Sequence, residues 1–174
     1  MQCDAMAPDR RPSLFFLLAA LLGTLHAVPS FYWALGGDWL LASVGQWAVD
    51  ALGDDVLLAG VGLAIVGVVK LAAAWIPLLA EAGRIPWRRF WRALCWVGGP
   101  GLVLYGGVNV VVSALVLAGV VGDGDYFRPA MIGHAYIWGP LFLLWGAALT
   151  VGLVASRGRG LIRPEGDTQR SPRV

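Results

Sequence analysis

The stretch Ser13–Gly37, SLFFLLAALLGTLHAVPSFYWALGG, decides the fold of this chain. It follows the basic pair Arg10-Arg11, contains no acidic or basic residue, and ends in an aromatic cluster and two glycines. A helix of about 20 apolar residues crosses a hydrocarbon core about 30 Å thick. Tyrosine and tryptophan near the end of such a helix suit the membrane–water boundary. We therefore predict a first membrane-spanning helix over residues 13–35.

Three more hydrophobic runs follow the same pattern, and we predict membrane helices over residues 56–80, 93–121 and 130–155. The chain is 58% hydrophobic and 14% charged, whereas a soluble domain has about 25% charged residues. The mean hydropathy is +0.70. The predicted fold class is therefore all-α, a polytopic membrane protein with four transmembrane helices over residues 13–155, between polar tails at 1–12 and 156–174.

The basic residues predict the orientation. The first tail, the segment 81–92 and the last tail contain 2, 4 and 5 of them, and the other two connections contain 0 and 1. Because basic residues favour the cytoplasmic side, we predict that both termini are cytoplasmic. The excess of arginine over lysine, with abundant Gly, Ala and Val, is typical of a GC-rich bacterial genome, so the expected location is the bacterial inner membrane. The net charge of +2 excludes bulk electrostatic binding of nucleic acid.

The segment 36–55 predicts a short amphipathic helix on the membrane surface. Apolar residues recur there at the spacing of one helical face, namely Leu40, Val44, Trp47 and Ala51. Asp38 is placed to cap its start, and Gly53 to end it. In the third membrane run, Gly98-Gly99-Pro100-Gly101 predicts a bend or a local break.

The segment 81–92 combines arginines with aromatic residues, and its key positions are Arg84, Trp87, Arg88, Arg89, Trp91 and Arg92. This pattern predicts an anchor on anionic lipid headgroups, to which each basic residue contributes about 1 kcal/mol. Similar interleaving occurs in proteins that bind single-stranded nucleic acid. The position between two membrane helices favours lipid.

Polar residues at membrane depth are the candidates for a functional site. Lys70 lies near mid-span, and no Asp or Glu occurs within the four predicted helices. A central lysine costs about 2.5–3.5 kcal/mol on insertion scales. The other candidates for a polar pocket that opens outward are His26, Asn109, His134, Tyr32, Tyr105 and Tyr136.

Each candidate also has a purely structural interpretation. Lys70 could bond to backbone carbonyls or extend to the nearer interface. Histidine and asparagine commonly bond between membrane helices, and tyrosines form the interfacial belt. Two histidines without nearby carboxylates predict no metal site. The chain shows no set of nucleophile, base and orienting acid, so we predict no catalytic residues and no cofactor.

The stretch Tyr32–Gly37, YWALGG, resembles a bacterial family of small four-helix membrane proteins, the domain of unknown function 3995. Trp138-Gly139-Pro140 is similar to an element that enters the last helix of that family. The family is expected to carry a histidine beside the aromatic pair, where this chain has Ser30 and Phe31; its nearest histidine is His26. The resemblance implies a membrane location and a fold, and it implies no activity.

These observations favour a small non-enzymatic membrane protein. It would bind a small lipidic or anionic ligand around Lys70, or serve as the partner subunit of another membrane protein. The first alternative is a small homodimeric transporter or channel, because Gly/Pro-interrupted helices often line transport sites. The second alternative is a membrane enzyme that acts on lipid or quinone substrates.

Overall fold

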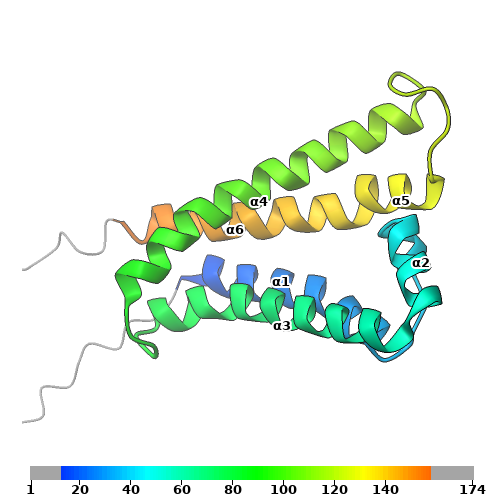
Figure 1. The fold of residues 1–174 in the computed structure, drawn as a ribbon. Helices are drawn as coiled ribbons and strands as arrows, with labels where there is room; N and C mark the ends of the chain where they lie inside the picture. Colours follow the sequence, from blue (N-terminus) through cyan, green and yellow to red (C-terminus); the bar gives the residue numbers. More distant parts are fainter. Residues whose placement is uncertain (1–12, 158–174) are drawn as a thin grey trace, which may run out of the picture.

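The computed structural model describes residues 13–157, and all its regular elements are helices (Figure 1). Four spans are long and apolar enough to cross a membrane: α1 (Leu14–Ala34), α3 (Val56–Glu81), α4 (Arg88–Leu117) and the last span, Arg128–Ala155. The last span comprises α5 (Arg128–Gly133), the π-helical stretch η2 (His134–Trp138) and α6 (Gly139–Ala155). The prediction of an all-α chain with four helices long and apolar enough to cross a membrane is confirmed. The tails 1–12 and 158–174 lie outside the described residues.

The third membrane helix differs from its predicted range of 93–121. α4 begins at Arg88, because the arginine-rich segment continues the helix. It ends at Leu117, where Gly119 adopts a φ of +69°. The amides of Gly119 and Val120 donate to the carbonyls of Val116 and Leu115, which is the Schellman pattern of a helix end.

The break expected at Gly98–Gly101 is absent, because α4 is one continuous helix through these residues. Backbone groups within a bilayer have no water to bond, so intrahelical hydrogen bonds outweigh the weak helix propensity of glycine. Gly99 is buried there against α6, where an added Cβ would lie 2.6 Å from the Thr150 hydroxyl.

The helices lie side by side in the order α3, α1, α6, α4 (Figure 1). α1 packs extensively on α3, α4 packs extensively on α6, and the contact of α1 with α6 joins the two pairs. The outer helices α3 and α4 touch each other little. The central helices α1 and α6 are therefore the more buried, and the outer helices expose most of their apolar surface.

Glycines allow α4 and α6 to pack closely against each other. A Cβ added to Gly106 would lie 2.6 Å from the carbonyl oxygen of Gly139, and one added to Gly146 would lie 2.6 Å from that of Gly99. Real Cβ atoms do not approach backbone atoms so closely, so the two backbones are nearly in contact. Small residues commonly allow such packing between membrane helices.

The connection between α1 and α3 contains η1 (Leu41–Ser43) and α2 (Gln46–Asp54). Asp38 does not cap α2 as expected, because Gly45 occupies the N-cap position, and α2 continues past Gly53. The carboxylate of Asp55 instead caps α3, where it accepts hydrogen bonds from two backbone amides at 3.1 and 3.0 Å. The break between α2 and α3 at Asp55 provides the unpaired amides that an acidic cap satisfies.

We predict that Gly146→Ala lowers the free energy of unfolding in detergent by about 1–3 kcal/mol, because its methyl group forces α4 and α6 apart. The matched control is Gly98→Ala, whose Cβ would meet nothing within 4 Å. The control should be neutral or stabilising by up to about 1 kcal/mol, from helix propensity alone. Equal effects of the two substitutions would contradict the close packing.

Candidate functional site

Two polar side chains meet where α1 packs on α3, and a third lies on the same face of α1. Lys70 of α3 donates from its Nζ to the Oγ of Ser30 on α1, at 3.0 Å. His26 lies four residues before Ser30, so the two side chains share one face of α1. His26 and Ser30 are buried, with 4% and 1% of their surfaces exposed, and Lys70 is half-buried. We call these three residues the polar layer.

Aromatic rings of the last span pack around His26. The ring centroid of Phe142 lies 3.9 Å from that of His26, and those of Trp138 and Trp145 lie at 5.5 and 6.4 Å. Both ring nitrogens of His26 and the indole nitrogen of Trp145 are buried without a hydrogen-bond partner among the described residues. A buried unpaired polar group costs about 1–3 kcal/mol, so the polar layer has free capacity for hydrogen bonds.

Two apolar clusters enclose the polar layer along the helix axes. One cluster lies toward α2 and contains Trp33, Leu41, Ala48 and Trp138. The other contains Phe16, Leu149 and Leu153 near the opposite ends of α1 and α6. The polar layer is thus covered on the side of α2, where the indole of Trp138 donates to the Ser43 carbonyl and hydroxyl at 3.1 and 3.0 Å.

The polar layer and the adjoining indole of Trp145 together have more hydrogen-bond donors than acceptors. The ammonium group of Lys70 and the indole of Trp145 can only donate, and the Ser30 hydroxyl already accepts from Lys70. The acidic residues of the described chain lie elsewhere, at Asp38, Asp50, Asp54, Asp55, Glu81, Asp123 and Asp125. Within residues 13–157, Lys70 forms no ion pair. The layer therefore suits a ligand that brings an acceptor or a negative charge.

The structure thus brings together two of the seven predicted pocket residues, Lys70 and His26. Tyr105 lies outside the polar layer, where its ring packs edge-on against Phe142 with centroids 5.1 Å apart. Asn109 donates to the carbonyl of Tyr105, four residues earlier in the same helix, at 2.8 Å. This hydrogen bond lies within α4, whereas the structural interpretation of Asn109 expected a bond that joins two helices.

The remaining three lie outside the polar layer. A ring nitrogen of His134 lies 3.2 Å from the carbonyl oxygen of Val44, so His134 joins the last span to the segment before α2. The ring of Tyr32 lies over Gly37, and Tyr136 is 71% exposed. Sequence reasoning missed Ser30, although its spacing of four residues from His26 placed it on the same helical face.

The predicted lipid anchor divides into two groups. Arg88 pairs with the buried Glu81 at 2.7 Å, and Arg92 pairs with the second oxygen of the same carboxylate. Arg92 also donates to the Ser156 hydroxyl at 2.8 Å, so these charges join the ends of α3, α4 and α6. Arg84, Trp87 and Arg89 are exposed, and Trp91 is half-buried.

We predict that Glu81→Gln lowers the free energy of unfolding by roughly 2 kcal/mol, because it leaves two arginines without their shared carboxylate. The control is Asp123→Asn, which removes an exposed carboxylate without an ion pair in the described chain. Thermal unfolding in detergent measures both. Similar midpoints for the two variants would mean that the Glu81 cluster does not stabilise the helix ends.

Comparison with known proteins gives one family. No curated protein and no solved structure matches the chain. The family model described as "Protein of unknown function (DUF3995)" matches residues 23–149. This range runs from the middle of α1 into α6 and includes the whole polar layer with the rings around it. The chain therefore belongs to the DUF3995 family, as its YWALGG stretch indicates.

Proposed function

We propose that this protein is a non-enzymatic membrane protein that binds a small lipophilic anion, with the charged group at Lys70. The observation that carries the proposal is the Lys70 amine, held 3.0 Å from Ser30 among hydrogen-bond donors and without a carboxylate nearby. An anionic oxygen beside Lys70 forms a charge-assisted hydrogen bond, which is about twice as strong as a neutral one. It also offsets the cost of a lysine at membrane depth.

An apolar groove between α1 and α3 supplies a place for the remainder of the ligand. It has a volume of about 580 Å³ and is lined by Phe31 and Leu35 of α1 and by Val61 and Ala64 of α3, among others. Ligand pockets commonly measure about 300–1,000 Å³. Phe31 is next to Ser30, and Ala64 precedes Lys70 by six residues, or about 9 Å of helix. Lys70 does not line the groove and lies about 120° around α3 from Ala64. The proposed ligand is therefore a carboxylate whose medium-length alkyl chain lies in the groove and whose charged group extends beyond it to the amine.

The same proposal includes the placement in the membrane. The described chain ends and the turn between α3 and α4 lie at one end of the helices (Figure 1). That end carries Arg84, Arg88, Arg89, Arg92 and Arg157, which favours the cytoplasmic side of a bacterial inner membrane. The exposed Arg84, Trp87 and Arg89 would rest on anionic lipid headgroups there. α2 would then lie at the outer surface.

A second candidate function is a small homodimeric transporter. The π-helical stretch His134–Trp138 favours it, because π-turns within membrane helices are frequent at functional sites. Trp138 of this stretch packs on His26. The outer helices α3 and α4 are free to pair with a second copy. Crosslinking in native membranes should then trap dimers, and a purely monomeric result would contradict this function.

We predict that the full chain in nanodiscs binds decanoate saturably and binds decanol much more weakly, because only decanoate pairs with Lys70. Lys70→Met should weaken decanoate binding at least about tenfold, the effect of losing one charge-assisted hydrogen bond. The matched control is Asn109→Leu, which removes a membrane-depth polar group outside the polar layer. Unchanged decanoate binding by a folded Lys70→Met variant would refute the proposal.

Lys70 is the only lysine in the sequence, which allows a second test on the unaltered protein. A membrane-soluble amine reagent should acylate Lys70 in liposomes, and decanoate should slow this reaction while decanol does not. Peptide mass spectrometry separates Lys70 from the terminal amine. Acylation that decanoate does not slow would contradict binding at this site.

A further inference from the structure

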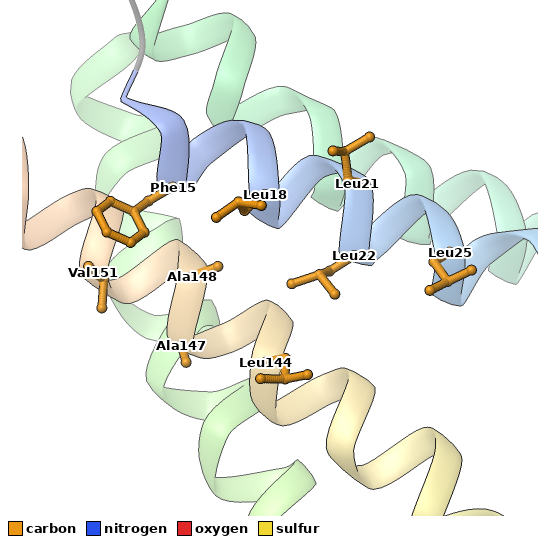
Figure 2. A pocket seen from close by; sticks show the side chains of 9 residues that line it. All are labelled: Phe15, Leu18, Leu21, Leu22, Leu25, Leu144, Ala147, Ala148 and Val151. Carbon is orange, nitrogen blue, oxygen red and sulfur yellow. The ribbon is translucent and has the colours of Figure 1, made fainter.

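A second apolar groove runs between the two central helices, on the surface formed by α1 and α6 (Figure 2). Its volume is about 440 Å³. Phe15, Leu18 and Leu25 line it from α1, and Leu144, Ala147 and Val151 line it from α6. Figure 2 shows the side chains of the two helices on either side of the groove, with the small Ala147 and Ala148 along the α6 side. We propose that it holds one acyl chain of an anionic phospholipid.

The length and the position of the groove fit this occupant. From Phe15 to Leu25, α1 rises by about 15 Å, which is half of a hydrocarbon core about 30 Å thick. The groove therefore begins near the end of the spans and stops near mid-membrane, as one leaflet's acyl chain does. The lining side chains named above are all apolar, so the groove offers no partner for a polar ligand within it.

The positive charge at the end of the groove near Phe15 and Val151 favours an anionic lipid headgroup. Phe15 and Val151 lie at the end of the helices that carries Arg157 and the arginines of the segment 84–92. Arg157 stacks on the ring of Trp96, with its guanidinium 3.9 Å from the ring centroid. Glu81 is the only acidic residue at this end of the described chain. An anionic phosphate headgroup therefore complements this end, and a zwitterionic one does so less well.

This site is separate from the one proposed for the lipophilic anion. α3, which carries Lys70, packs on α1, and this groove is lined by α1 and α6 alone. The separation provides reciprocal controls. Ala147→Leu fills the α1/α6 groove, and Ala64→Leu fills the groove between α1 and α3. Both substitutions replace alanine with a larger apolar residue that favours helix.

The test is native mass spectrometry of the full chain with phosphatidylglycerol and with phosphatidylcholine of the same acyl chains. The wild type should retain one phosphatidylglycerol molecule and retain phosphatidylcholine less. Ala147→Leu should reduce the retention of phosphatidylglycerol about tenfold, through lost contacts with a few methylene groups. Ala64→Leu should leave the retention of phosphatidylglycerol unchanged and reduce the binding of decanoate instead. Circular dichroism checks that both variants fold.

A measurement on the unaltered chain keeps the test independent of the variants. Phosphatidylglycerol with a photoactivatable diazirine in its acyl chain should label residues 15–25 and 144–151, and unlabelled phosphatidylglycerol should compete. Labelling spread evenly over α3 and α4 would overturn the proposal. So would equal retention of the two phospholipids, an Ala147→Leu variant that retains lipid like the wild type, or a dimer that Ala147→Leu dissociates. The last result would assign the groove to a second copy of the chain.

Discussion

The packing of α1 on α6 holds the structure together. Each of these helices carries one outer helix, and α3 and α4 touch each other little. The contact of α1 with the last span is built from rings: Trp33 packs edge-on against Trp138 of η2 with centroids 5.6 Å apart, and His26 lies against Phe142 of α6. Because lipid is as apolar as these side chains, close packing rather than the hydrophobic effect drives such contacts. These large rings therefore provide much of the packing between α1 and the last span.

The same contact buries the polar layer. α1 presents His26 to the rings of the last span and Ser30 to Lys70. Ring packing leaves both nitrogens of His26 and the indole nitrogen of Trp145 without partners in the described chain. Polar groups that remain unpaired in this setting weaken the fold. These unpaired groups lie close to the Ser30–Lys70 hydrogen bond, which is why the proposed ligand site is placed there.

The charged end of the helices shows a different use of polar groups. Glu81 is 7% exposed, and two arginines of α4 share its carboxylate. Arg92 also reaches the Leu153 carbonyl and the Ser156 hydroxyl of the last span. Here an acidic side chain faces the cations, although the Nε of Arg88 stays buried without a partner in the described chain. At membrane depth Lys70 has no such carboxylate.

The sequence by itself determined that the chain is all-helical, that four segments are long and apolar enough to cross a membrane, and which family it belongs to. Long apolar runs carry that information because a bilayer requires every backbone group to bond within a helix. The tertiary structure alone decided that α4 passes unbroken through Gly98–Gly101, that His26 and Ser30 meet Lys70, and that Asn109 and Tyr136 lie elsewhere. In a soluble protein, polar and apolar faces would have predicted these contacts. In a membrane helix both the lipid-facing and the buried faces are apolar, so the sequence pattern does not reveal which face meets which helix.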